Sequence, residues 1–76
     1  MSNLERMQIF ERQADKAYRQ MFDATTASDA TALYNETKDA LFGGLRIAYE
    51  VRDPAALDRL ARSLWAVRAV FRSQFP

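Results

Sequence analysis

Small and apolar residues recur every three or four positions in three separate segments of this 76-residue chain. That spacing places each set on one side of an α-helix. Three such helices can bury these sides only against one another or against a partner. We therefore predict an all-α fold, an up-down-up antiparallel three-helix bundle, formed by a single domain over residues 1–76. The sets are Met7, Phe10, Ala14, Ala17 and Met21, widened by Leu4, Tyr18 and Phe22; Ala30, Leu33, Thr37, Ala40, Gly44, Ala48 and Val51; and Leu57, Leu60, Leu64, Val67 and Phe71.

Capping residues mark the beginnings of the first two helices. Ser2 or Asn3 can accept a hydrogen bond from the free amides of a first helical turn. The second helix can be capped by Thr26, which has Asp29 three residues later, or by Ser28. The three helices are expected over about residues 4–23, 29–51 and 54–74.

The third helix has the clearest start signal in the chain. Asp53 can cap it, and Pro54 suits the first helical position, where no amide hydrogen is needed and φ is already helical. Because the residue before a proline is restricted from the α conformation, Arg52 or Asp53 must leave the α region, which ends the second helix before Pro54. A joint this short favours antiparallel neighbours.

Gly43 and Gly44 leave two interpretations of the second helix open. Each glycine costs about 1 kcal/mol relative to alanine inside a helix, so the pair can divide or kink the segment, and a division gives four short helices. The spacing instead continues from Ala40 through Gly44 to Ala48 without a change of phase, which favours one continuous helix. In a continuous helix, Gly44 would let a neighbouring helix approach closely.

The residue types present are unsuited to most catalytic and metal chemistry. The chain has no histidine and no cysteine, so the commonest acid–base group, the thiol nucleophile and the usual zinc ligands are missing. Gly43-Gly44 is not followed by the lysine and hydroxyl residue of a phosphate-binding loop. We therefore expect no catalytic activity, no cofactor, no metal site and no small-molecule substrate.

Hydropathy and cysteine usage bear on location. The longest apolar run covers residues 40–45, which is far shorter than the roughly 20 residues of a membrane span. We therefore expect no membrane association. The absence of cysteine fits a reducing compartment, so the expected location is the cytoplasm.

Phe42 and Tyr49 lie off the predicted contact sides. They are seven residues apart and share one stripe of the second helix. A middle helix that packs against two neighbours needs a wide apolar surface, which is one explanation for this stripe. The other explanation is an interface with a further protein chain.

Trp65 is the other large residue that the three sets leave over. It lies about 100° around the helix from Leu64, and Arg62, Arg68 and Arg72 are its neighbours on the helix surface. Either the arginine stems cover or stack on the ring, or the cluster is a binding patch, because aromatic residues and arginine are enriched at interface hot spots. Small size favours self-association. We therefore predict a protein interface, with a homodimer as its expected form, that uses Phe42, Tyr49, Trp65, Arg68 and Arg72.

The alternative is a small nucleic-acid-binding or regulatory domain that uses the arginines of the third helix. Residues 46–76 carry six arginines and three acidic side chains, although the net charge of the whole chain is only +1. Arg59 and Arg62 lie on a different side of the helix from Arg68 and Arg72. This division, and the lack of Asn, Gln or Lys on one base-facing side, make protein contacts the preferred prediction.

The order of small and apolar residues in the second and third helices carries a family resemblance. It consists of Ala32-Leu33-Tyr34, Ala40, Leu41, Leu45, Ala48-Tyr49, Asp53-Pro54, Leu57, Leu60 and Ala61. This order resembles the helical hairpins of tetratricopeptide-repeat proteins and the three-helix microtubule-interacting-and-transport domain. The resemblance implies a protein-binding role, in which a helical peptide lies in a groove between helices. The chain departs from the repeat family because it has no 34-residue repeat and no Trp-x-x-Leu-Gly start.

Overall fold

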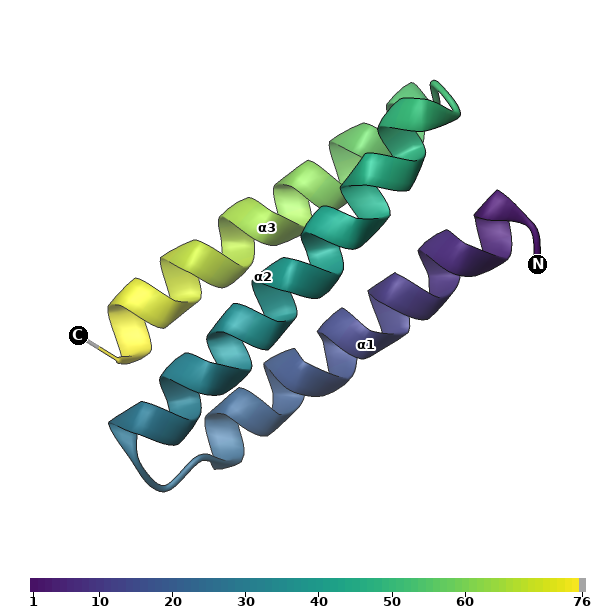
Figure 1. Ribbon diagram of the computed structural model, residues 1–76. Coiled ribbons are helices and arrows are strands. Elements are labelled where there is room, and N and C mark those ends of the chain that lie inside the picture. The colour runs from purple at the N-terminus through teal and green to yellow at the C-terminus, as the bar shows by residue number, and fades with distance from the viewer. Residues whose placement is uncertain (76) are drawn as a thin grey trace.

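A computed structural model, described here over residues 1–75, contains three long helices that run up, down and up (Figure 1). The prediction of an all-α three-helix bundle is confirmed. The middle helix contacts both of its neighbours, and the two chain termini lie at opposite ends of the long axis. The helices are α1 (Asn3–Asp23), α2 (Ala27–Glu50) and α3 (Pro54–Gln74).

Side-chain caps set the beginning of each helix. The Asp29 amide donates to Oγ1 of Thr26 over 3.0 Å, so α2 begins at Ala27, two residues earlier than expected, and Ser28 lies inside the helix. Ser2 and Asp53 accept equivalent hydrogen bonds at the starts of α1 and α3. The three caps satisfy amides that would otherwise lack a partner within the helix.

The turn between α2 and α3 is closed by two backbone hydrogen bonds. The Asp53 amide donates to the Ala48 carbonyl over 3.0 Å, and the Arg52 amide donates to the Tyr49 carbonyl over 3.2 Å. This pair of bonds is the Schellman arrangement, which requires a left-handed residue at its centre. Arg52 takes that conformation, with φ of 56°. Helical conformation therefore ends before Pro54, as predicted.

Gly43 and Gly44 lie within one continuous helix, so the interpretation with four short helices is wrong. Gly43 faces Phe10 of α1: a methyl group placed at Gly43 would lie 2.5 Å from Cε1 of the Phe10 ring. Gly44 is buried and approaches Leu60 of α3. The glycine pair therefore admits one large side chain from each neighbouring helix.

Small residues make up much of the interior. Alanine supplies six of the twelve buried apolar residues, and the largest side chains that are fully enclosed are Met21, Leu60 and Thr37. The Thr37 hydroxyl donates to the Leu33 carbonyl within its own helix, so the buried hydroxyl group has a hydrogen-bond acceptor. The buried apolar residues are Met7, Ala14, Ala17, Met21, Ala30, Ala40, Leu41, Ile47, Ala48, Ala56, Leu60 and Val67.

The predicted contact sides differ from the observed core in three ways. Leu4, Phe22 and Val51 are exposed, and each lies one residue from a helix boundary. Leu41 and Ile47 are buried although the prediction left them out. Their burial widens the apolar surface of α2, since a middle helix must bury two contact sides. Phe10, Leu33, Leu57, Leu64 and Phe71 are only partly buried.

The molecule is long and thin. Its principal extents are 38 × 22 × 13 Å, and its radius of gyration is 12.7 Å, compared with about 11.4 Å for a compact domain of this length. Within residues 1–75, no helix is long and apolar enough to cross a membrane.

The space at Gly43 that the Phe10 ring occupies, which we call the Gly43 notch, predicts that alanine at position 43 lowers stability. Gly43→Ala improves helix propensity by about 1 kcal/mol, but the new methyl group collides with the Phe10 ring and costs roughly 1–3 kcal/mol through overpacking. We expect a net loss of stability in urea unfolding. In a Phe10→Ala background the collision is absent, and the same change is expected to stabilise. Stabilisation of the otherwise unchanged chain would contradict the notch.

The left-handed conformation of Arg52, in the turn between α2 and α3, predicts that a change to glycine at this position raises stability. Left-handed conformation costs a non-glycine residue about 1–2 kcal/mol, and the extra freedom of glycine in the unfolded chain offsets about 0.5–1 kcal/mol of this. Arg52→Gly should therefore raise the free energy of unfolding by roughly 0.5–1 kcal/mol. Arg52→Ala, which removes the same side chain and keeps the strain, is the control and should show no gain.

Candidate protein-interaction face

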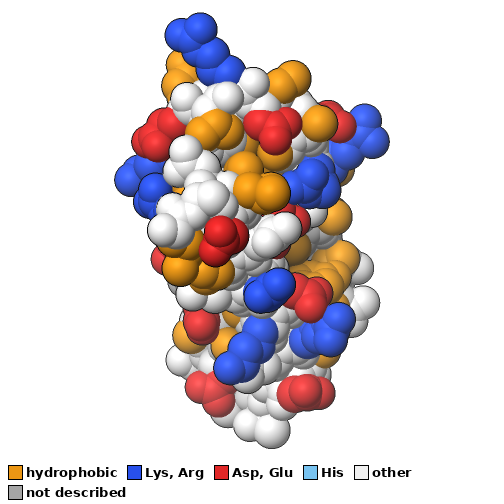
Figure 2. All heavy atoms as spheres, turned by 90° about the vertical axis from the view of Figure 1, so that its right-hand side faces the viewer, with side chains coloured by type: hydrophobic (Ala, Val, Ile, Leu, Met, Phe, Trp, Pro, Cys, Tyr) orange, Lys and Arg blue, Asp and Glu red, His pale blue; other side chains and the backbone are white. Residues whose placement is uncertain are grey.

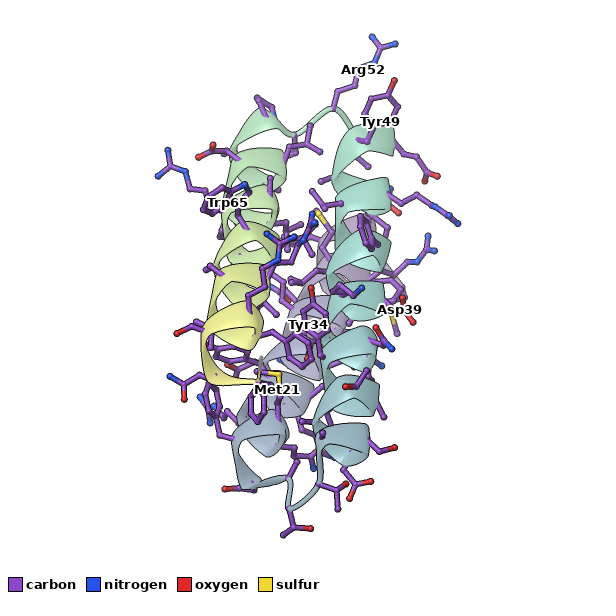
Figure 3. All side chains as sticks on the ribbon, turned by 90° about the vertical axis from the view of Figure 1, so that its left-hand side faces the viewer. Met21, Tyr34, Asp39, Tyr49, Arg52 and Trp65 are labelled. Atoms are coloured by element: carbon purple, nitrogen blue, oxygen red, sulfur yellow. The ribbon has the colours of Figure 1, made fainter. Side chains whose placement is uncertain are left out.

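The hairpin of α2 and α3 has two sides, and α1 lies across only one of them. On that side, Phe10 of α1 lies against Gly43, and Arg59 of α3 pairs with Glu11 of α1. Figure 3 looks onto the other side, where α2 and α3 stand in front and α1 lies behind them. No helix of the described chain covers this side.

We call this uncovered side the outer face. It combines half-buried apolar residues, exposed aromatic rings and three cations. Figure 3 shows Trp65 at its α3 edge and Tyr49 at its α2 edge, near the turn, with Tyr34 between the two helices. The outer face consists of Tyr34, Lys38, Phe42, Leu45 and Tyr49 of α2 and Leu57, Leu64, Trp65, Arg68, Phe71 and Arg72 of α3.

Stacked rings join α2 to α3 at one end of the outer face. The rings of Tyr34 and Phe71 are nearly parallel, at 3°, with their centroids 4.0 Å apart. The ammonium of Lys38 lies 4.6 Å from the centre of the Tyr34 ring, and the Phe75 ring stacks on that of Phe71. These contacts hold the two helices side by side, which fixes the surface between them.

Three aromatic side chains of the outer face extend into solvent. The exposed fractions are 54% for Phe42, 75% for Tyr49 and 76% for Trp65. A wide apolar side does exist on α2, but Leu41 and Ile47 supply it. The structure therefore leaves Phe42 and Tyr49 available to a further partner. Their role as an interface stays a prediction.

Trp65 is not covered by its arginine neighbours. Trp65, Arg68, Ala69 and Arg72 line a shallow hollow of about 140 Å³, so the structure does bring these three predicted residues together. Within residues 1–75, the close cation–π contact is that of Lys38 on Tyr34, and none involves the indole. The ring and the guanidinium groups beside it are thus both free to contact another molecule.

The arginines of α3 divide into paired and unpaired groups. Arg59 binds Glu11 of α1 at 2.7 Å, and this hydrogen bond and charge raise the pKa of Arg59 above its ordinary value. Arg62 binds Asp58 at 3.0 Å. In the described part of the chain, Arg68 and Arg72 have no carboxylate within 4.0 Å. The free positive charge of α3 therefore lies on the outer face.

The α1 side has a different charge pattern. Figure 2 looks toward it and shows basic and acidic side chains intermixed over its surface. Such a surface is typical of a face in contact with water. The outer face, by contrast, carries Lys38, Arg68 and Arg72, and Glu50 borders it at the turn end, where it lines a hollow with Tyr49 and Leu57.

A groove that sequence reasoning missed lies between α1 and α3. It has a volume of about 430 Å³, with Thr37 and Leu41 of α2 at its base. Small residues on its two walls, among them Ala14 and Ala66, leave the space between α1 and α3 unfilled. The small residues of α3 on that side are visible in the sequence and could have predicted the groove. None of the five predicted interface residues lines this groove.

The comparisons with known proteins add no relative. No protein-family model, curated protein or solved structure was found to match this chain. The resemblance to helical protein-binding domains therefore stays a prediction. Within residues 1–75, no three acidic side chains gather closely enough to hold a metal ion.

The Tyr34–Phe71 stack predicts measurable coupling between α2 and α3. In a double-mutant cycle with Tyr34→Ala and Phe71→Ala, the two losses of stability should differ from additivity by about 1 kcal/mol, because the rings stack face to face. The control is Tyr49→Ala with Phe71→Ala, whose members lie at opposite ends of the outer face. Urea unfolding of the six proteins measures both cycles, and equal coupling in the two would contradict the role of the stack.

Proposed function

We propose that this chain is a small protein-interaction module without catalytic activity, and that its outer face is where it contacts other protein chains, a second copy included. One observation supports this most directly. Large aromatic side chains lie outside, at Phe42, Tyr49 and Trp65, while alanine and glycine occupy much of the interior. The proposed location is the cytoplasm, where a chain without cysteine forgoes no stabilising disulfide.

The total surface area supports the same proposal. The accessible surface is 5348 Å², whereas a compact monomer of 8.7 kDa exposes about 4,700 Å². The chain therefore exposes roughly 600 Å² more than expected for its mass. The exposed rings of Phe42, Tyr49 and Trp65 contribute to this surface, and a partner that covered them would remove apolar area from water.

Nucleic acid is the second candidate partner. Unpaired arginines beside exposed rings are the groups that bind single strands. However, ion pairs hold Arg59 and Arg62, which leaves only Arg68 and Arg72 of the third-helix arginines available on the outer face. Two such cations support only a weak contact with phosphates.

A photo-crosslinking experiment tests the proposed function. A photoreactive phenylalanine analogue at position 42, on the outer face, should form adducts with protein in living cells. The same analogue at position 4 is the control, because Leu4 is also an exposed apolar residue, at 60%, and lies on α1. Protein adducts at both positions, or at neither, would contradict a role for the outer face.

A further inference from the structure

We propose that a second copy of this chain covers the outer face, and that arginine side chains of each copy stack on aromatic rings of the other. The inference rests on the proposed function, because it assigns an occupant to the same face. Three observations carry it: the area to be covered, the apolar middle of the face, and its charges.

The excess surface matches what a small dimer needs. Each chain exposes roughly 600 Å² beyond the expectation for a compact monomer of its mass. Two copies that covered this excess would bury about 1,200 Å² together, which is the lower limit for a specific, stable interface.

The middle of the outer face is apolar enough to form the centre of such a contact. Leu45, Leu57 and Leu64 are partly buried and pack on the core from this side. Two hairpins placed face to face would enclose these leucines in a four-helix layer, with one α1 on each outside surface. The parts of these leucines that are now exposed would then be buried, which the interior of a single chain does not achieve.

The charges of the outer face determine how two copies can meet. Lys38, Arg68 and Arg72 would repel their counterparts, and Glu50, which lines a hollow with Tyr49 and Leu57, lies at the turn end of the face. Its aromatic rings are the groups available to receive a cation. Trp65 is exposed and has no cation over its ring in the described part of the chain. Lys38 already lies over Tyr34 within each copy, so Trp65 and the arginines beside it are the ring and the cations that remain for a contact between copies.

A two-fold arrangement can satisfy both copies at once. In a symmetric contact, residue i of one copy meets residue j of the other, and j meets i. Two antiparallel α3 helices that cross between positions 68 and 69 place position 65 of each copy opposite position 72 of the other. We therefore assign the reciprocal stack of Trp65 on Arg72 as a polar contact at the α3 edge of the dimer interface.

Arg62 supplies a matched control. It neighbours Trp65 on the same helix, as Arg72 does, and it carries the same charge. It is 80% exposed, and Asp58 already binds it. Arg62→Gln and Arg72→Gln therefore remove the same charge from the same helix, but only the second change removes a guanidinium from the outer face.

Light scattering and sedimentation of the purified chain test the inference. We expect a concentration-dependent dimer whose dissociation constant rises about tenfold in Arg72→Gln and in Trp65→Ala, and stays within about twofold in Arg62→Gln. A tenfold rise in salt concentration should change the constant by less than about threefold, since stacked cations and rings are screened less than exposed ion pairs. Circular dichroism of each variant confirms that the helices are retained.

Three outcomes would overturn the inference. A monomer at all concentrations would exclude the second copy, and the crosslinks from position 42 to a different protein would then show whether the proposed function survives. A dimer that Arg62→Gln weakens as much as Arg72→Gln would exclude the stack. A rise in mass that is accompanied by bound nucleic acid, seen in the ultraviolet absorbance, would assign the outer face to nucleic acid instead.

Discussion

The close approach of α1 and α2 is the constraint on which the rest of the structure depends. Alanines at positions 14, 17 and 40 and the glycines at 43 and 44 leave little side-chain volume between the two helices. A tight helix pair gains dispersion contacts along its whole length, but apart from the position of the Phe10 ring against Gly43 it leaves little space for aromatic rings. The third helix then packs on α2 through Leu60 and Val67, and the large residues that find no room inside are left at the periphery.

Much of the fold could be predicted because it rests on local signals. Capping side chains, the Asp53-Pro54 pair and the unbroken phase through Gly44 each act over a few residues, and each is visible in the sequence. The burial of Leu41 and Ile47 could not be predicted in the same way. It depends on the directions in which α1 and α3 lie around α2, which are set by packing between helices and not by the spacing within one.

The sequence was sufficient to predict which residues of the candidate site are exposed, but not which contacts the residues around them make. Subtracting the contact sides from the sequence indicates Phe42, Tyr49 and Trp65, and the structure finds all three exposed. The sequence does not show that Arg59 is drawn to α1 by Glu11, which lies 48 positions away. It also does not show that the rings of Tyr34 and Phe71 meet, because long-range pairs of this kind follow from tertiary arrangement. The division of the α3 arginines into paired and unpaired sets therefore required the structure.

The contact of Phe10 with Gly43 has a consequence for the register of the bundle. Two helices that meet through alanine can slide along each other with little change in contact area, because one small residue resembles the next. A slide by one helical turn, about 5.4 Å, would move the Phe10 ring from the glycine onto the side chain of Asp39 or Ile47. The ring and its notch thus act as a positional stop, which selects one alignment of α1 on α2 from several that the alanines alone would tolerate.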